Sequence, residues 1–302
     1  MRAAVFDRYG PPDVLRVIAL PDPTPGPGEV LVRVHAAGVQ PFDVAVRGGT
    51  MPWVKATFPQ QLGQEYSGVV EQIGPEVRDL PVGTPVLGST MLNGAAELLT
   101  VPAGNVVVKP GILDFPTAAG LVAAAQTASG ALQELGVTAS DVLLVHAGAG
   151  SVGTIATQLA RLTGATVIGT ASPGNHDYLR EIGAVPVPYG KGLLEAIRTT
   201  GLTPTVALDA AGGEAIAQSV ALGIDPDRVG TIVDDKAAAE FGTRVVRAGR
   251  SPQRLAEVVA LAAQGRITMP IRTFTLDEIA AAHAVVESRH GRGKVVVTVA
   301  SR

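Results

Sequence analysis

Residues 141–153 read DVLLVHAGAGSVG, an apolar strand that runs into a glycine-rich turn and then into a helix. Within it, Gly148, Gly150 and Gly153 have the G-x-G-x-x-G spacing. In this context the first glycine permits a tight turn, the second lets the backbone approach a pyrophosphate, and the third lets helix and strand pack closely. The segment therefore predicts a dinucleotide-binding turn, and a turn that serves only packing is the alternative.

The residues that follow this turn indicate which dinucleotide binds. Ser151 and Val152 begin the helix, where free N–H groups and the positive end of the helix dipole favour phosphate. An NAD site usually has Asp or Glu about 20 residues further on. Here the end of the second strand reads Gly169-Thr170-Ala171-Ser172 without a carboxylate, and Ser172, Asn175 and His176 offer hydrogen-bond donors instead. This pattern favours NADP(H), with plain helix capping as the alternative for Asn175 and His176.

The pattern of the remaining chain predicts an α/β protein with two domains. Strands and helices alternate from about residue 114 to residue 233, as in a parallel, doubly wound sheet. Residues 1–112 contain short strands separated by Pro and Gly, with one short helix at 41–48. Because no further mononucleotide unit follows Val233, we expect the C-terminal piece to return to the first domain. The predicted domains are 1–112 with 266–302, and 113–265.

Composition excludes several other classes of protein. The 302 residues carry a formal net charge of −3, which disfavours nucleic acid as the main partner. There is no cysteine, so disulfides, thiol nucleophiles and cysteine-ligated zinc are excluded. The N-terminal MRAAVFDRYGPP has no secretory pattern, and residues 118–132 are too weakly apolar to span a bilayer. We expect a cytoplasmic protein without a membrane segment.

Six segments in this order carry a family resemblance: GEVLVRVHAAGVQPFDVAVRGG, LGQEYSGVVEQIG, VHAGAGSVG, TASPGNHDYLREIGA, LDAAGG and RGKVVVTV. Together they resemble a zinc-independent medium-chain dehydrogenase/reductase of the quinone oxidoreductase (zeta-crystallin-like) and 2-enoyl reductase branch. The resemblance implies a GroES-like, β-rich catalytic domain (1–112 and 266–302) and a Rossmann domain that binds NADP(H) (113–265). It also implies an active site in the cleft and a homo-oligomer, expected to be a dimer.

The chain departs from the zinc-dependent relatives where those have metal ligands. Gln40 and Pro41 stand in the first ligand segment and Gln64 in the second, so we expect no metal. Gln40 also replaces the asparagine typical of the zinc-free branch, whereas the Asp and Arg of that motif are retained. The resemblance makes Gln40, Asp43 and Gln64 the candidate catalytic residues. For Asp43, an ion pair with Arg47 is the alternative; Glu65 has a structural alternative too.

Further site residues follow from the resemblance alone. Thr127 resembles a threonine near the nicotinamide, Tyr189 a tyrosine near the adenosine phosphate, and Ile232 and Val233 a strand end whose backbone meets the carboxamide. No side chain is assigned as proton donor. An apolar substrate slot is expected from a group of large side chains, with ordinary core packing as the alternative: Phe42, Met51, Trp53, Phe58, Met91 and Leu92. The histidines His35, His146 and His283 are expected to be packed or hydrogen-bonded.

The expected function is reduction of a quinone or an α,β-unsaturated carbonyl compound by NADPH. Hydride addition to a conjugated acceptor spreads the charge, so it needs no Lewis-acid metal. The partner is then a small apolar conjugated substrate. The alternative is a scaffold protein that holds a dinucleotide without turnover, which the unusual Gln40 and the missing proton donor allow.

Overall fold

The computed structural model describes residues 1–299, and the chain divides into two compact units. The first unit contains Met1–Ala123, Ser251–Gln264 and the chain from Met269 onward. The second contains Ala124–Arg250 and Gly265–Thr268. Helix α2 (Phe115–Glu134) contributes to both units.

The first unit is built from two sheets. A seven-stranded sheet has the order β15-β16-β3-β5-β6-β8, with β7 also paired to β3, and a three-stranded sheet has the order β2-β1-β4. All the pairs are antiparallel except β15 with β16. The strands are β1 (Arg2–Phe6), β2 (Leu15–Ala19), β3 (Glu29–Val39), β4 (Gln60–Gln61), β5 (Glu65–Ile73), β6 (Pro85–Ser89), β7 (Leu98–Pro102), β8 (Val106–Val108), β15 (Ile271–Thr275) and β16 (Lys294–Thr298).

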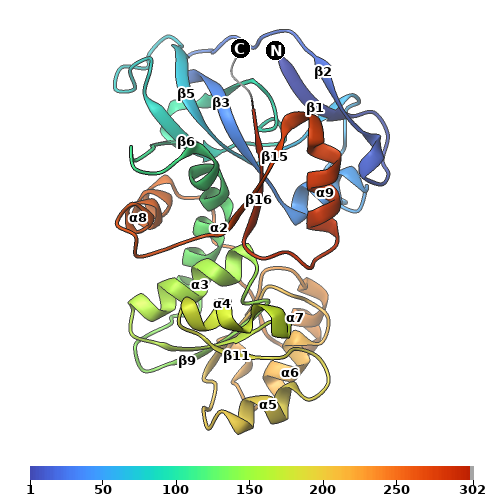
Figure 1. Cartoon of the computed structure of the whole chain (residues 1–302), viewed down its shortest axis with the longest axis vertical. Coiled ribbons are helices and arrows are strands. Elements are labelled where there is room, and N and C mark those ends of the chain that lie inside the picture. Colours follow the sequence, from blue (N-terminus) through green and yellow to red (C-terminus); the bar gives the residue numbers. More distant parts are fainter. Residues whose placement is uncertain (300–302) are drawn as a thin grey trace. The chain divides into compact units, whose positions relative to one another are not determined.

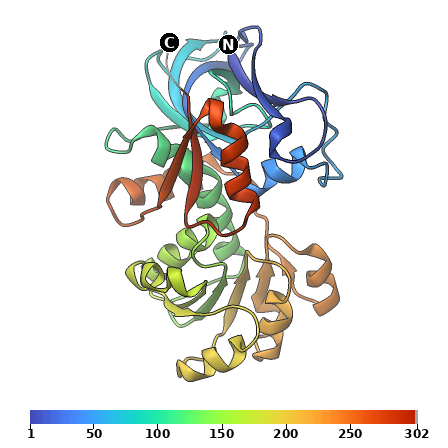
Figure 2. The same cartoon turned by 45° about the vertical axis from the view of Figure 1, so that its right-hand side comes forward.

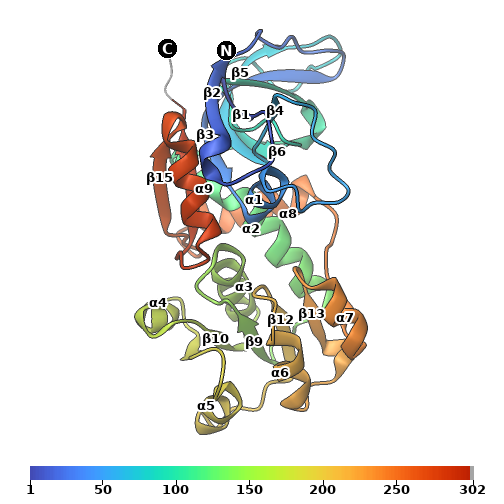
Figure 3. The same cartoon turned by 90° about the vertical axis from the view of Figure 1, so that its right-hand side faces the viewer.

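The C-terminal strand completes this sheet. β16 pairs with β3, so that Val297 lies opposite Ala37. The chain therefore returns to the first unit, as the sequence predicts. Three helices also belong to the unit: α1 (Pro41–Arg47), α8 (Pro252–Ala263) and α9 (Ile279–Glu287). α9 packs on β15 and β16 (Figure 2) and also contacts α1 (Figure 3).

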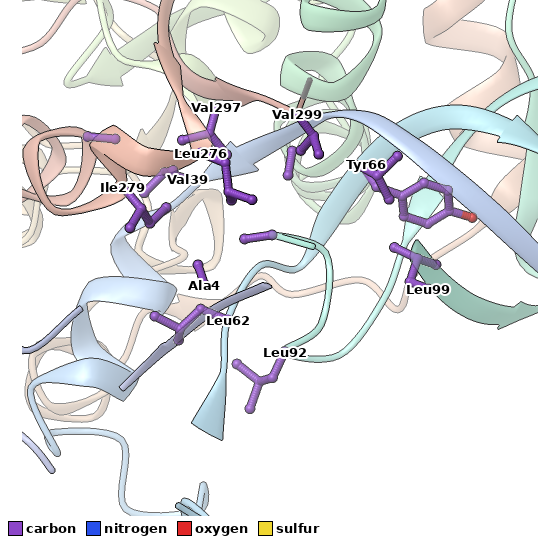
Figure 4. Packing of buried hydrophobic residues seen from close by; sticks show 14 of the residues in the cluster. Ala4, Val39, Leu62, Tyr66, Leu92, Leu99, Leu276, Ile279, Val297 and Val299 are labelled. Carbon is purple, nitrogen blue, oxygen red and sulfur yellow. The ribbon is translucent and has the colours of Figure 1, made fainter. Parts of the chain in front are cut away.

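A single apolar cluster forms the main core of the first unit (Figure 4). Fully buried side chains come from segments that are far apart in the sequence, including Phe6, Leu62, Tyr66 and Val297. Burial of this kind stabilises a fold by about 25 cal/mol for each Å² of apolar surface. The core therefore fixes the position of α1 and of the segment around Leu62, which carry candidate site residues.

The second unit contains a six-stranded parallel sheet with the order β11-β10-β9-β12-β13-β14. The chain leaves β9 on one side and returns to add β12 on the other, which confirms the predicted doubly wound sheet. Figure 1 shows β9 and β11 with α3 and α4 alongside. The strands are β9 (Val142–His146), β10 (Thr166–Thr170), β11 (Val185–Val187), β12 (Val206–Asp209), β13 (Val229–Thr231) and β14 (Arg244–Val245), and the helices are α3 (Ser151–Leu162), α4 (His176–Glu181), α5 (Leu193–Thr199), α6 (Ala215–Ala221) and α7 (Asp235–Phe241).

The two units differ from the predicted domain boundaries in three places. Residues 113–123 lie in the first unit, where the Ser67 hydroxyl donates to the Phe115 carbonyl (2.6 Å). Residues 251–264 also lie there, because α8 packs against β8. Residues 266–268 lie in the second unit together with Gly265, and the Thr268 backbone forms two hydrogen bonds with the Gln158 side chain there (2.8 and 2.9 Å).

Within residues 1–299, no helix has both the length and the hydropathy that crossing a membrane requires.

Candidate functional site

The glycine turn in the second unit connects β9 to α3. Ala147, at the start of this turn, has a φ of 58°, so the left-handed residue is Ala147 and not Gly148. A Cβ on Gly148 would lie 3.2 Å from Gly169 Cα in β10, and one on Gly153 would lie 2.3 Å from the Ala147 carbonyl. The predicted role of Gly153 in close packing agrees with this geometry. Gly148 lies inside the tight turn as predicted, because the Gly150 N–H donates to the Ala147 carbonyl (3.0 Å) across it. Its missing side chain also allows β10 to approach.

Gly150 differs from these two glycines because the position of its missing side chain is less crowded. A Cβ there would meet only the Ala147 carbonyl, at 3.3 Å. Gly150 is the N-cap of α3, no side chain caps the helix, and the N–H groups of Ser151 and Val152 stand in its first turn. A twelve-residue helix with an uncapped N-terminus beside an open glycine is suited to bind an anion. The turn therefore fits the pyrophosphate of a dinucleotide.

Hydrogen bonds to the neighbouring strand hold the turn in place. The N–H of Ala147 donates to Thr170 Oγ1 (3.1 Å), and the N–H of Gly148 donates to the Thr170 carbonyl (2.9 Å). Below them, Thr154 Oγ1 and the Tyr178 hydroxyl lie 3.0 Å apart. These bonds fix the turn, so the N–H groups of Ser151 and Val152, which would contact phosphate, are held in place.

The residues expected near the 2′-phosphate lie together after β10. Asn175 Nδ2 donates to Ser172 Oγ (3.3 Å), and His176 Nε2 lies 3.2 Å from the Ala171 carbonyl. The Ala171 N–H donates to the carbonyl of Val187, the last residue of β11. Tyr189 comes two residues after Val187, so it lies at the same edge of the sheet, and it is 58% exposed. Asn175 is the N-cap residue of α4, but its side chain makes no capping hydrogen bond to that helix. Because Ser172 Oγ accepts from Asn175, the Ser172 hydroxyl proton can still be donated.

Asp209, which the sequence analysis did not single out, organises the next strand end. Its side chain is fully buried and accepts the N–H groups of Ala211 and Gly212 (both 2.8 Å) and the Thr231 hydroxyl (2.7 Å). Thr231 Oγ1 in turn accepts the N–H of Val233 (3.1 Å). The sequence signal was available: a carboxylate that ends an apolar strand and precedes A-A-G-G has few partners other than backbone N–H groups.

The predicted carboxamide contacts at Ile232 and Val233 are partly occupied by the protein itself. The Ile232 N–H donates to the Asp209 carbonyl (3.0 Å), and the Ile232 carbonyl accepts Arg247 Nε (3.3 Å). A carbonyl has two lone pairs, so that of Ile232 keeps one for a further donor. Thr127 lies half-buried in α2.

In the first unit, Gln40 and Asp43 form a reciprocal cap at the start of α1. The Gln40 N–H donates to Asp43 Oδ2 (2.9 Å), and the Gly63 N–H donates to Asp43 Oδ1 (3.2 Å). Burial raises the pKa of Asp43 to about 7, against the opposing effect of these N–H groups and of the Lys294 charge. Asp43 therefore joins α1 to the segment that carries Gln64, and it is buried too deeply to meet a substrate.

The side-chain amides of the two predicted glutamines lack strong acceptors. Gln40 Nε2 is buried and has no hydrogen-bond partner within the described part of the chain. Gln64 Nε2 contacts only a weak acceptor, Met91 Sδ at 3.8 Å. A buried donor without an acceptor lowers the stability of the folded protein by about 1–3 kcal/mol. A ligand oxygen that accepts this hydrogen bond would recover that free energy on binding.

Two predicted alternatives for charged residues have different outcomes. Arg47 does not pair with Asp43; its NH2 donates to Glu287 Oε1 of α9 (2.9 Å), because both Asp43 oxygens already accept backbone N–H groups. Glu65 is structural as proposed, since it forms a buried ion pair with Lys294.

The three histidines have separate environments. His35 stacks on Phe115 with 4.2 Å between ring centroids, and His146 Nε2 lies 2.9 Å from Ser219 Oγ. His283 is 1% exposed, and burial lowers its pKa to about 3. Over residues 1–299, no group of three or more His, Cys, Asp or Glu side chains could hold a metal ion.

The large apolar side chains of the expected slot do not behave alike. Leu92 is buried in the core of the first unit, and Met51 and Phe42 are partly buried and pack against that core. Trp53 and Met91 are exposed (65% and 62%), and Phe58 is 44% exposed. The core-packing alternative therefore holds for Leu92 and not for Trp53 or Met91.

Comparisons with known proteins agree with this architecture. Residues 26–147 match the family model of the alcohol dehydrogenase GroES-like domain, and residues 195–297 match that of the zinc-binding dehydrogenases. The solved quinone oxidoreductase from Coxiella burnetii is 30% identical, covers 99% of both chains and has a TM-score of 0.92. These matches confirm the predicted GroES-like and Rossmann-type architecture.

Curated relatives include enzymes of similar length and segments of much larger ones. A mitochondrial NAD(P)H oxidoreductase of Danio rerio is 30% identical, with 99% of this chain and 91% of the relative covered. A chloroplastic NADPH-dependent alkenal/one oxidoreductase of Arabidopsis thaliana is 29% identical (98% and 79% covered). The chain spans only 13% and 5% of the length of two Streptomyces polyketide synthases, to which it is 32% and 31% identical.

Proposed function

Since this chain belongs to the medium-chain dehydrogenase/reductase superfamily, in the branch of the quinone oxidoreductases and enoyl reductases, we propose that it reduces a quinone or an α,β-unsaturated carbonyl compound with NADPH. The observation that carries the proposal is the unpaired amide donor of Gln40, the one expected catalytic residue among the buried side chains of the described chain that have a polar atom without a partner.

The second unit supports NADPH as the cofactor. The open position at Gly150 and the uncapped start of α3 suit the pyrophosphate. Beyond β10 no carboxylate stands where it would repel a 2′-phosphate, and Ser172 and Asn175 are placed there together. The Arabidopsis relative is by its description NADPH-dependent and acts on alkenals and alkenones.

The first unit supports a conjugated acceptor. NADPH, when bound, supplies a hydride, and hydride addition to a conjugated carbon moves the electron pair onto the acceptor's oxygen. The Gln40 amide would donate to that oxygen and the Gln64 amide would supply a second donor, as hydrogen-bond donors do in oxyanion holes. The anion then takes one proton from water, so that the acceptor gains a hydride and a proton in all.

Kinetics on matched variants test this role of Gln40. Gln40→Leu removes the donor, and we expect kcat/KM with an enone to fall about tenfold to a hundredfold. Gln40→Asn keeps the amide and should retain more activity than Gln40→Leu. Gln133→Leu, an exposed change in α2, is the control. Equal activity of Gln40→Leu and the unmodified protein, or no NADPH oxidation with any enone or quinone, would refute the proposal.

The same assay tests independence from metal. Gln40, Pro41 and Gln64 offer no charged ligand at the positions of the zinc ligands in relatives. We expect a chelator to leave the rate unchanged. Activity that is lost on chelation and regained on zinc addition would contradict this expectation.

A further inference from the structure

An exposed aromatic stack joins α1, the helix whose N-cap is Gln40, to the segment that follows it. Phe42 is the second residue of α1, two positions after Gln40, and its ring stacks on that of Trp53 with centroids 5.2 Å apart and planes 29° apart. Phe42 packs against the main core of the first unit, whereas Trp53 is 65% exposed. Phe42 thus fixes the indole ring while most of the Trp53 surface stays in water.

An exposed aromatic ring that is held by a partly buried neighbour is suited to bind a ligand. Phe42 restricts the Trp53 ring before any ligand arrives, which lowers the entropy cost of stacking a ligand on it.

The segment of the chain that carries Trp53 has little charge, which suits a neutral, flat ligand. Between Gly48 and Gln64 the only charged residue is Lys55. A second aromatic pair lies in the same segment, where Phe58 and Tyr9 meet edge to face with centroids 5.4 Å apart. The Ala56 N–H donates to the Tyr9 hydroxyl (3.3 Å), so this pair fixes the far side of the segment.

We infer that Trp53, supported by Phe42, is the surface on which the acceptor lies, and that it selects flat ring acceptors of the quinoid class over extended acyl thioesters. This inference rests on the proposed function and narrows its substrate class. An electron-poor quinone ring stacks well on an electron-rich indole. An acyl thioester chain has no ring to stack and gains only apolar contact.

Trp53 is the only tryptophan of the chain, so its fluorescence reports this contact without turnover. The protein is titrated with a naphthoquinone in the absence of NADPH, beside free N-acetyltryptophanamide. We expect saturable quenching in the protein and linear, collisional quenching of the free compound. Phe42→Leu should weaken the saturable phase several-fold. A linear titration of the protein, equal to that of the free compound, would overturn the inference.

Kinetics provide the second readout. Trp53→Ala should lower kcat/KM about tenfold for the naphthoquinone and less than twofold for an acyclic enone, and Trp53→Phe should retain most of the quinone activity. Val82→Ala, an exposed apolar change in the same unit, is the control. If Trp53→Ala slows both acceptors equally, or dissociates an oligomer while doing so, the stack is not a ring-selecting surface.

Failure of this inference and failure of the proposed function give different results. If NADPH is oxidised with either acceptor but quenching is collisional, the reductase function stands and the role of the Phe42–Trp53 stack in binding the acceptor is wrong. If quenching saturates but no acceptor oxidises NADPH, the stack binds quinones and the reductase function is wrong.

Discussion

Glu65 and Lys294 form an ion pair inside the first unit, with the two side chains only 0% and 4% exposed. The other carboxylate oxygen of Glu65 accepts the backbone N–H of Ala123 in α2 (2.7 Å). The pair therefore connects three elements, β5, β16 and α2, around a charge that water does not reach.

Breaking this pair on one side should be much more costly than removing it whole. Lys294→Met leaves the Glu65 carboxylate buried without a counter-charge, and we expect a loss of about 3–5 kcal/mol in the free energy of unfolding. The double variant Glu65→Gln with Lys294→Met should be more stable than Lys294→Met alone. Urea denaturation measures both; a single variant as stable as the unmodified protein would contradict the assignment.

Asp43 predicts a dependence of stability on pH. Its pKa in the folded protein is raised from 3.8 to about 7 by burial, so the folded protein binds this proton more tightly than the unfolded chain does. The stability that Asp43 contributes is present below pH 4 and is lost as the pH rises to about 7, by an amount on the order of a few kcal/mol.

Two buried histidines act in the opposite direction and must be separated from Asp43. Burial lowers the pKa of His146 to about 4 and that of His283 to about 3, so their contribution is lost as the pH falls below 6.5. The test is the difference between the unmodified protein and Asp43→Asn in thermal unfolding from pH 4 to pH 8. Asp43→Asn should lack the decline that Asp43 causes, and identical pH slopes would show that Asp43 does not titrate there.

Alanine substitutions at Gly150 and at Gly153 are expected to affect different properties, NADPH binding in the first case and stability in the second. Gly153→Ala places a Cβ 2.3 Å from the Ala147 carbonyl, so the fold must shift and we expect a loss of more than about 2 kcal/mol in stability. Gly150→Ala meets one atom at 3.3 Å and should keep stability within about 1 kcal/mol, while the added methyl group weakens NADPH binding. Calorimetry of unfolding and of NADPH binding separates the two effects. Equal stability losses would contradict them.

The predicted preference for NADPH depends on the residues after β10. Ser172→Asp places a carboxylate where we expect the 2′-phosphate, so the Kd for NADPH should rise about tenfold or more. NADH, which lacks the phosphate, is the internal control and should bind as before or better. An unchanged Kd for NADPH would place the phosphate elsewhere.

How much the sequence predicted depends on how local each feature is. The strand, turn and helix around Gly150 follow from adjacent residues, and the structure has them as predicted. Gly148 lies in the tight turn as predicted, but the left-handed residue of that turn is Ala147, which a glycine pattern does not reveal. The i,i+4 spacing suggested an ion pair between Asp43 and Arg47, but tertiary partners prevailed.

Long-range partners explain the features that the sequence could not indicate. The ion pair of Glu65 with Lys294 joins strands that are far apart in the sequence, and the residues around either one do not indicate its partner. Asp209 was within reach of prediction, because a carboxylate at the end of an apolar strand must find donors, yet its link to Thr231 requires the order of β12 and β13.

The most direct test of the proposed reaction follows the hydride itself. NADPH carrying deuterium at the nicotinamide C4 is offered to the protein with a small enone, and with the matching saturated ketone in a separate reaction. Hydride transfer to a conjugated acceptor predicts deuterium at the β-carbon of the reduced enone, with the saturated ketone left unreduced. Deuterium at the carbonyl carbon of the saturated ketone, with the enone untouched, would contradict the account.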